Sequence, residues 1–323
     1  MKKRIILFLI SFSLIAALIY VSDPGQIAVT LSKTNPAYVG LALGFWMFGV
    51  LVRTGRWSYL LRRTGIEVRF LTLVKYYLAG MAVSDLSPAK SGDAIRPLFL
   101  KKIKGESFSR GLGSVLAERI FDIIALSIIS LVSLSMLPIT SPWMRWLYLA
   151  IVIYAVVIFF GVYLIFSGKM EPFLDRLVAF FSFVPRVKKL EARVEEFSGK
   201  LRQSLRKYRN PGTLAVTLLI SILVWLIVGL LVKSVFLSLG ENVPLLVILA
   251  VYSTGILLGL LTFLPGALGS NEVIQASLYG TLLTLSTSTI TSALLLTRMA
   301  NFFIYVLIGA ILLSTMPKEL VDF

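Results

Sequence analysis

Three ionisable residues lie inside one apolar stretch of the chain, where charge is costly. The stretch 112–137 contains Glu118, Arg119 and Asp122. The two acids are four residues apart, so they share one face of a helix. Burying a charge in a bilayer costs at least about 2.5–3.5 kcal/mol, so these groups need partners or water. They indicate either a functional polar site or an interfacial ion-pair cluster that only fixes the position of the helix.

Two further sets of residues that include charged side chains lie at breaks in other apolar stretches. Each break has the pattern Pro-x-x-x-Gly followed by a small or acidic residue. The first break contains Pro88, Lys90, Gly92, Asp93 and Arg96, and the second contains Pro265, Gly266, Gly269, Ser270 and Glu272. Asp93 and Ser270 suit the N-cap positions of the helices that follow. A free helix N-terminus at such a break attracts an anion.

These residue types are suited to binding a phosphate group. Arginine gives planar, bidentate contacts to phosphate oxygens. The candidate phosphate-binding residues are Lys90, Arg96, Arg119 and Arg298. The candidates for holding these cations in place, or for carrying a coupling proton, are Asp93, Glu118, Asp122 and Glu272. The expected hinges of the two breaks are Pro88, Gly92, Pro265, Gly266 and Gly269.

The composition points to a membrane protein. Hydrophobic residues make up 57% of the 323 residues, above the roughly 45–50% that is usual for soluble domains. The chain contains neither Cys nor His, which excludes disulfides, thiol nucleophiles, Ser-His-Asp catalysis and the usual zinc sites. The net charge of +16 comes from basic residues that flank apolar stretches. Membrane topology therefore explains it better than nucleic-acid binding does.

The elements that must position these residues are membrane helices. Apolar stretches fall at 5–21, 38–52, 70–83, 112–137, 143–166, 214–237, 244–264, 273–285 and 290–313, and about 20 residues cross a bilayer. We expect an all-α, polytopic membrane bundle that forms a single domain, 1–323. It would have about six full spans and two re-entrant hairpins, 70–100 and 244–285. No cofactor is expected.

The distribution of Lys and Arg predicts the orientation in the cell (inner) membrane. Basic residues mark the cytoplasmic ends of spans, which places both termini in the cytoplasm and makes 5–21 an uncleaved first span. Arg53, Arg56, Arg62, Arg63 and Arg69 are expected in a cytoplasmic loop after the second span. The segment 167–212 is expected to be a basic, amphipathic cytoplasmic piece, either on the anionic leaflet or packed on the bundle.

The two hairpins would open toward opposite faces. That is the pattern of an inverted repeat, which in transporters places the substrate site at the midplane between broken helices. The alternative is a chance match, because Pro and Gly are both common in membrane helices.

The ordered motifs resemble those of a known family. Pro88, Gly92-Asp93-x-x-Arg96, Glu118-Arg119-x-x-Asp122 and Leu264-Pro265-Gly266-x-x-Gly269-x-x-Glu272 resemble the lysylphosphatidylglycerol synthase transmembrane family, also called the flippase-like domain family. The resemblance implies a helical membrane domain that moves a lipid between leaflets. Its best-understood members add a cytoplasmic aminoacyl-transferase, for which this chain, ending at Phe323, is expected to have no room.

The favoured function is therefore a flippase-like protein that translocates or binds a phosphate-bearing lipid, either a phospholipid or a polyprenyl-phosphate lipid. Expected partners are membrane lipids with anionic headgroups and a separate transferase or biosynthetic enzyme. Replacing Arg96 or Arg119 with Ala is expected to abolish lipid translocation without unfolding the protein. The alternatives are a glycosyl-transferase-type enzyme, a subunit or a scaffold in lipid or envelope biosynthesis. The sequence shows no Asp-x-Asp, Walker A or Gly-rich nucleotide motif, so an enzyme is the less favoured interpretation.

Overall fold

A computed structural model describes residues 2–87, 92–105, 108–138, 141–167 and 207–317. Within these ranges every regular element is a helix. The α-helices are α1 (Lys2–Val21), α2 (Pro24–Ser32), α3 (Pro36–Arg63), α4 (Phe70–Asp85), α5 (Ile95–Lys104), α6 (Phe108–Ser135), α7 (Pro142–Ser167), α10 (Pro211–Ser238), α11 (Leu245–Leu260), α12 (Ser270–Leu282), α13 (Thr287–Arg298) and α14 (Ile304–Ser314). A 3-10 turn (Pro265–Ala267) follows α11, and a π-helical turn (Met299–Phe303) joins α13 to α14.

The centre of the bundle is the antiparallel pair α3 and α10. Both helices begin with the same signal, Asn-Pro: the side chains of Asn35 and Asn210 accept hydrogen bonds from the first backbone N–H groups. The proline that follows each one is tolerated at the first helical position, where its missing N–H is not needed. The start of α3 lies beside the end of α10, where the Asn35 backbone N–H donates a hydrogen bond to the Ser238 carbonyl at 2.7 Å.

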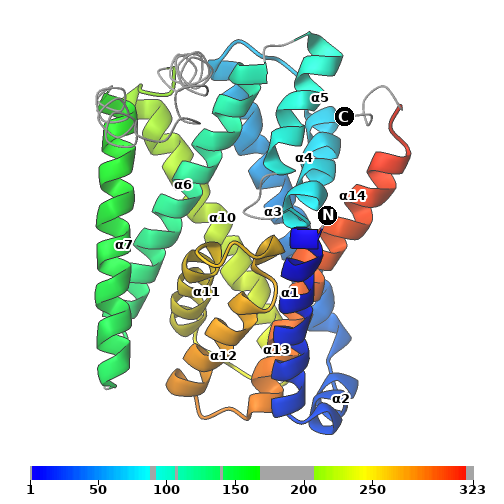
Figure 1. The fold of residues 1–323 in the computed structure, drawn as a ribbon, viewed down its shortest axis with the longest axis vertical. Coiled ribbons are helices and arrows are strands. Elements are labelled where there is room, and N and C mark those ends of the chain that lie inside the picture. The colour runs from blue at the N-terminus through cyan, green and yellow to red at the C-terminus, as the bar shows by residue number, and fades with distance from the viewer. Residues whose placement is uncertain (1, 88–91, 106–107, 139–140, 168–206, 318–323) are drawn as a thin grey trace.

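Both re-entrant hairpins are present. The arms of the first hairpin, α4 and α5, have 16 and 10 residues, and those of the second, α11 and α12, have 16 and 13. None of these four helices has the roughly 20 residues that a helix needs to cross the membrane. The hairpins enter the bundle from opposite ends and their tips approach each other at mid-height (Figure 1).

The packing of the hairpins has the symmetry of an inverted repeat. α4, in the first hairpin, packs against α14, while α11, in the second, packs against α6. Each hairpin therefore packs against the helix or helix run that follows the other hairpin in the chain. This exchange, together with the antiparallel α3–α10 pair, is what a two-fold axis in the membrane plane produces.

The long helices fit a membrane-spanning protein. By length and composition, four described segments can cross: α3, α7, α10 and the continuous run Thr287–Ser314. The bent pair of α1 and α2, with an angle of 83° between them, could supply a fifth crossing. α6 is also 28 residues long, but its central charges lower its hydropathy. The expected number of about six crossings requires α6, whose charges are compensated inside the bundle.

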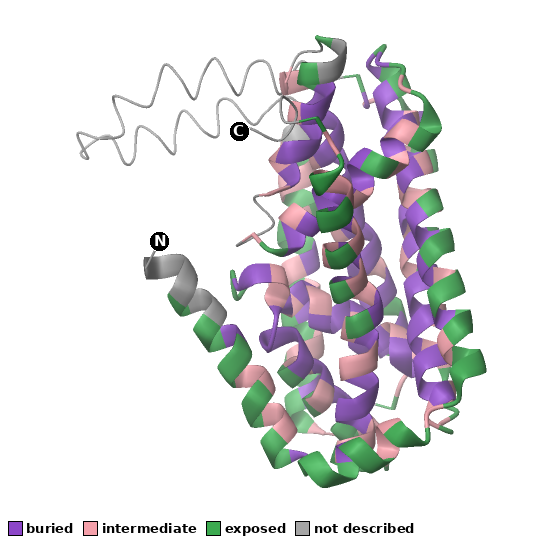
Figure 2. Ribbon diagram, turned by 90° about the vertical axis from the view of Figure 1, so that its right-hand side faces the viewer, coloured by how far each residue is buried: buried purple, intermediate pink, exposed green. Residues whose placement is uncertain are grey.

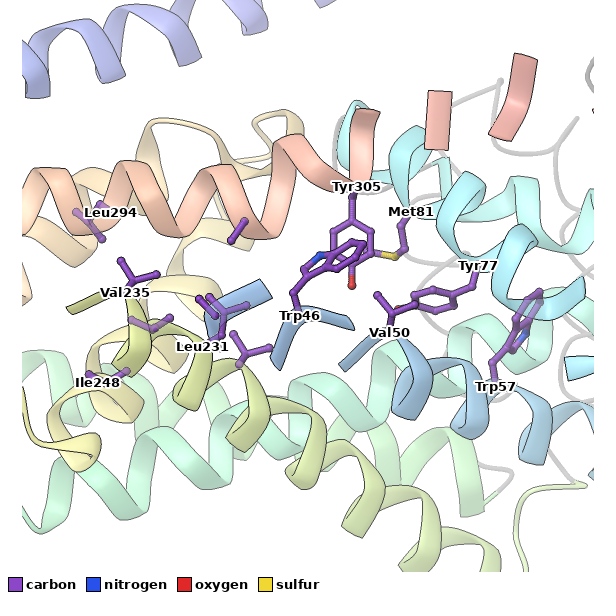
Figure 3. Packing of buried hydrophobic residues seen from close by; sticks show 14 of the residues in the cluster. Trp46, Val50, Trp57, Tyr77, Met81, Leu231, Val235, Ile248, Leu294 and Tyr305 are labelled. Carbon is purple, nitrogen blue, oxygen red and sulfur yellow. The ribbon is translucent and has the colours of Figure 1, made fainter. Parts of the chain in front are cut away.

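Burial is arranged as in a bundle surrounded by hydrocarbon. Aromatic and aliphatic side chains from α3, α4, α10 and the α13–α14 run form the main core (Figure 3). Within it, the Trp46 and Tyr305 rings lie with their centroids 5.1 Å apart. Large apolar side chains on the outside of the bundle are exposed, and α1 leans away from the bundle toward its N-terminal end (Figure 2).

Gly309 on α14 allows that helix to approach α4 closely. A Cβ atom at this position would overlap the Ala82 side chain and lie 2.8 Å from the Leu78 carbonyl oxygen. We expect Gly309→Ala to lower the free energy of unfolding by about 1–3 kcal/mol through overpacking. Thermal unfolding in detergent would measure this. Gly161→Ala on α7 is the matched control, since nothing lies within 4 Å of a Cβ there. Equal stabilities of the two variants would contradict the prediction.

Candidate functional site

The first break is held by an ion pair between the turn before α5 and the middle of α6. The Arg119 guanidinium donates to both carboxylate oxygens of Asp93, at 2.5 Å and 2.7 Å. The Arg119 side chain is 24% exposed and that of Asp93 is 12% exposed. This bidentate contact fixes the plane of the guanidinium while leaving part of it accessible.

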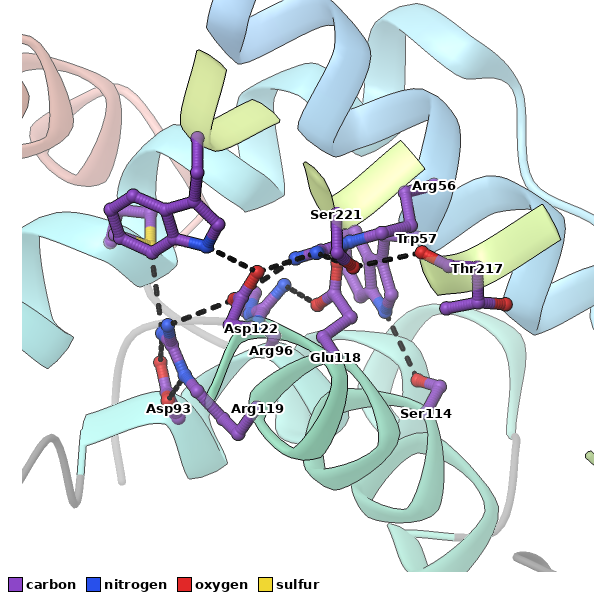
Figure 4. Close-up of polar contacts among 12 residues, drawn as sticks. Arg56, Trp57, Asp93, Arg96, Ser114, Glu118, Arg119, Asp122, Thr217 and Ser221 are labelled. Atoms are coloured by element: carbon purple, nitrogen blue, oxygen red, sulfur yellow. Dashed lines mark hydrogen bonds and ion pairs between the residues drawn. The ribbon is translucent and has the colours of Figure 1, made fainter. Parts of the chain in front are cut away.

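Next to this pair lies a chain of buried charges, shown in Figure 4. Arg96 of α5 donates to Glu118 at 2.6 Å, and the other Glu118 oxygen lies 3.4 Å from Nε of Arg56. Arg56 of α3 donates to both oxygens of Asp122, at 2.6 Å and 3.1 Å, and to the Ser221 hydroxyl of α10. Opposite charges in contact offset one another's desolvation. Four helices are joined by these contacts.

Aromatic rings enclose Arg96. Its guanidinium carbon lies 5.1 Å from the ring centres of both Trp57 and Tyr77, close enough for cation–π attraction. Gly80 on α4 leaves room for the Arg96 stem, since a Cβ there would overlap it. With 1% exposure, Arg96 is a buried link between helices.

The second break is held by an analogous pair. Arg298 donates through Nε to Glu272 at 2.5 Å and through a terminal nitrogen to the Gly266 carbonyl at 3.1 Å. The second Glu272 oxygen accepts the Gly269 backbone N–H at 2.7 Å, as in a capping box. Glu272 thereby closes the turn before α12 and fixes Arg298 at the end of α13.

The helix caps differ from those predicted. The N-caps are Ala94 for α5 and Gly269 for α12, so the expectation for Asp93 and Ser270 was wrong. In the first break the Asp93 carboxylate is engaged by Arg119 from another helix. In the second, the Glu272 carboxylate at position N3 accepts the backbone N–H of the N-cap residue Gly269, which is the bond that the N3 acid makes in a capping box.

The tips of the two hairpins touch at Gly266. A Cβ there would lie 2.9 Å from the Asp85 carbonyl oxygen and 2.6 Å from the Phe302 ring. The backbone of Gly266 also has φ of 56°, a left-handed conformation that glycine adopts without steric cost. Any side chain would therefore push the two breaks apart.

Between the breaks lies a cavity of about 120 Å³. Its lining includes Asp85, Arg119 and Asp122 from the first half and Asn271, Glu272, Gln275, Arg298 and Asn301 from the second. It is large enough for several water-sized groups. Phe263 lines it and is 63% exposed, so the cavity reaches the protein surface beside the tip of the second hairpin.

The structure separates the candidate residues into two groups. The residues that line the cavity are Arg119, Asp122, Gly266, Glu272 and Arg298. Arg96, Glu118 and Asp93 do not line it, since Arg96 pairs with Glu118 and Asp93 pairs with Arg119. Pro265 is buried in the 3-10 turn between α11 and α12. Gly92 and Gly269 lie in tight turns, where a Cβ would overlap backbone carbonyl groups of Val83 and Ser11. Pro88 and Lys90 lie outside the described residues, as does most of 167–212, namely 168–206.

Arg53 and Arg56 were missed by the sequence-based prediction. They were expected in a loop after the second span, but α3 continues to Arg63 and places both inside the bundle. Arg53 lines the cavity, donates to the Tyr305 hydroxyl at 3.1 Å and lies over the Trp225 ring. No described carboxylate is within ion-pair distance of it. The absence of Pro from residues 37–63 is the signal that could have extended the helix.

Comparison with known proteins agrees with this architecture. The family model described as "Lysylphosphatidylglycerol synthase TM region" matches residues 6–309. The chain belongs to this family. Because the match runs from α1 into α14, it includes both hairpins and every residue of the cavity.

The chain is similar over most of its length to membrane proteins of Methanothermobacter thermautotrophicus and Pyrococcus horikoshii. A UPF0104 membrane protein of Methanothermobacter thermautotrophicus is 28% identical over 292 residues, covering 86% of this chain and 85% of the relative. One from Pyrococcus horikoshii is 25% identical and covers 99% of both chains. A shorter match, 25% identical over 105 residues, is to the glycosyltransferase AglD of Haloferax volcanii, covering 32% of this chain and 17% of AglD.

Proposed function

We propose that this protein binds the phosphate of a membrane lipid in the cavity between its two hairpins and moves the lipid between leaflets. The observation that carries the proposal is the position of Arg53 on the cavity wall. Its guanidinium has a tyrosine hydroxyl, but no described carboxylate, as its polar partner. A buried cation that forms no ion pair with a carboxylate of the described residues favours an anionic ligand.

Two neighbouring arginines support the same ligand. Arg119 and Arg298 also line the cavity, and each is held in a fixed orientation by a carboxylate, Asp93 or Glu272. Guanidinium groups held in this way still present N–H groups to a phosphate. Three arginines from three different helices thus converge on one space.

The surroundings of the cavity favour a lipid over a soluble anion. The cavity lies where the hairpin tips meet, at mid-height in the bundle (Figure 1). It reaches the surface beside Phe263, and the nearby Leu261 is 54% exposed. We propose that acyl or prenyl chains leave the site there into the hydrocarbon, while the headgroup stays with the arginines. The basic end of the bundle would face the cytoplasm, following the positive-inside rule.

Arg53→Gln tests the proposal with little risk of unfolding, because it leaves no described carboxylate without its partner. We expect it to lower the rate of translocation of fluorescent anionic phospholipids in proteoliposomes about tenfold, the effect of losing one charge-assisted hydrogen bond. Dithionite quenching of label in the outer leaflet would measure the rate. Wild-type protein must exceed empty liposomes, and Arg63→Gln, at an exposed position of the same helix, should resemble wild type.

Two results would count against the proposal. The transport function would be refuted if proteoliposomes with wild-type protein moved neither phospholipids nor polyprenyl-phosphate lipids faster than empty liposomes do. Full translocation activity of the Arg53→Gln variant would show that Arg53 does not bind the phosphate. The match to AglD covers too little of that enzyme to support glycosyl transfer by this chain.

A further inference from the structure

The two halves of the chain match helix by helix. α3 and α10 each have 28 residues and α4 and α11 each have 16, and the second member of each pair begins 175 residues after the first, at 211 against 36 and at 245 against 70. α6 and the run Thr287–Ser314 both have 28 residues and begin 179 residues apart, at 108 and 287. Each residue of these first-half helices therefore has an equivalent position in the second half.

The ion pairs at the two breaks follow the same equivalence. Asp93 pairs with Arg119 in the first half, and Glu272 pairs with Arg298 in the second. Both pairs join residues that are 26 positions apart in the chain. In each half, an arginine of the helix after the hairpin thus holds an acid of the break.

Two glycines identify a further pair of equivalent side chains. Gly80 on α4 leaves room for Arg96, because a Cβ atom there would overlap the Arg96 stem. Gly255, which lies 175 positions later on α11, leaves room for Gln275 in the same way. Arg96 and Gln275 therefore occupy corresponding places, and only the first of them is charged.

The buried charges of the first half are replaced by neutral groups in the second. The equivalents of Arg96, Glu118 and Asp122 are Gln275, Thr297 and Asn301. Gln275 is hydrogen-bonded to Asn271 of its own helix at 2.8 Å, whereas the Thr297 hydroxyl has no hydrogen-bond partner in the part of the chain that is described. The second half thus lacks the helix-to-helix ion pair that Arg96 makes with Glu118 at 2.6 Å.

The arginine of the second break also has fewer partners. Arg119 has another carboxylate nearby, that of Asp122 at 3.8 Å, so it keeps an ion pair if Asp93 is lost. Among the described residues, Arg298 has only the carboxylate of Glu272 within ion-pair distance. Its remaining hydrogen bond goes to the Gly266 carbonyl. All the described side-chain hydrogen bonds that join α12 or the turn before it to the α13–α14 run therefore pass through Arg298.

The other arms of the hairpins differ in the same direction. Gly309 lets α14 approach α4 so closely that a Cβ atom there would lie 3.5 Å from the Ala79 Cα atom. The equivalent residues, Ser130 of α6 and Thr254 of α11, meet through their hydroxyl groups at 2.7 Å. Small residues allow helix backbones to pack in direct contact. The first hairpin is therefore packed against the backbone of its neighbour, whereas side chains separate the second hairpin from α6 at this position.

We infer that the second hairpin is the moving gate of the cavity, held closed by the Glu272–Arg298 ion pair, while the first hairpin is a fixed wall. The cavity already reaches the surface beside Phe263, at the tip of this hairpin. A closed and an open state that differ by one ion pair exchange populations when that pair is weakened. The inference goes beyond the proposed function, because it holds for any ligand that enters the cavity.

Two pairs of spin labels at equivalent positions test it. The natural sequence contains no Cys, so engineered cysteines carry the only labels. One protein has Phe48→Cys and Leu261→Cys, which report on the tip of the second hairpin. The other has Leu223→Cys and Leu86→Cys, which report on the first. All four side chains are 43–54% exposed. Double electron–electron resonance in detergent, without added lipid, measures the distance within each pair.

The ion pair of each break is then weakened by changing its acid to the amide. Glu272→Gln should raise the ratio of open to closed distances at the second hairpin about tenfold, as the loss of one charge-assisted hydrogen bond implies. Asp93→Asn should leave the distances at the first hairpin as they are without this change. Arg298→Gln and Arg119→Gln form a second matched pair, and circular dichroism shows which variants are folded.

Two outcomes would overturn the inference. One is an unchanged distance distribution at the second hairpin in both Glu272→Gln and Arg298→Gln. The other is an equal shift at the first hairpin in Asp93→Asn, which would make both hairpins mobile. Because no lipid is added, neither outcome bears on the proposed function. Conversely, a failure of lipid translocation in proteoliposomes would refute that function and leave the gate in place.

Discussion

Arg56→Ala is expected to lower the free energy of unfolding by about 3–5 kcal/mol, the cost of leaving buried carboxylates without their cation. Arg56 contacts both Asp122 and Glu118, and all three residues are at most 7% exposed. Its loss also leaves the Ser221 hydroxyl without this donor. Unfolding in a detergent micelle, followed by circular dichroism, would measure the change.

A double variant separates the charge effect from lost packing. Arg56→Met combined with Asp122→Leu removes both members of the bidentate pair, and we expect it to be more stable than Arg56→Ala, because apolar groups of similar size replace buried ion pairs at little cost. Arg62→Ala, on an exposed turn of α3, should change stability by less than about 0.5 kcal/mol. An Arg56→Ala protein as stable as Arg62→Ala would contradict the role of this network.

Arg119→Ala and Arg96→Ala are expected to fail in different ways, although the sequence suggested the same role for both. Arg119 lines the cavity and is partly exposed, so its loss should lower lipid translocation roughly tenfold to a hundredfold, as for a lost charged contact to phosphate. Arg96 lies off the cavity between two aromatic rings. Its loss should chiefly lower the unfolding temperature, since Glu118 would lose its closest cation.

Both quantities must be measured on the same preparations, with translocation expressed per folded protein. Arg119→Lys is a useful companion, because it keeps the charge but loses the bidentate geometry, and should recover part of the activity. An Arg96→Ala variant of wild-type stability with no translocation, beside an active Arg119→Ala variant, would reverse our assignment.

The sequence determined the class of the fold and the existence of two breaks. Long apolar stretches can only be placed against hydrocarbon, and segments interrupted by Pro and Gly are too short to cross it. These are local properties, so α4–α5 and α11–α12 could be predicted as hairpins without knowledge of their neighbours. The motifs at residues 88–96, 118–122 and 264–272, taken together in this order, also indicated the family, and the match over residues 6–309 then confirmed it.

Only the tertiary structure decided which charges meet. Arg56 and Asp122 are separated by 66 residues, and Arg298 reaches Glu272 across 26; the register of helix packing, which no local pattern records, brings them together. The sequence placed Arg53 and Arg56 in a loop because a basic cluster after an apolar stretch is usually cytoplasmic. Inside the bundle, acids on α6 compensate Arg56, and the Tyr305 hydroxyl and Trp225 ring accommodate Arg53. A buried charge is stabilised by partners from other helices, and those partners are known only once the helices are packed.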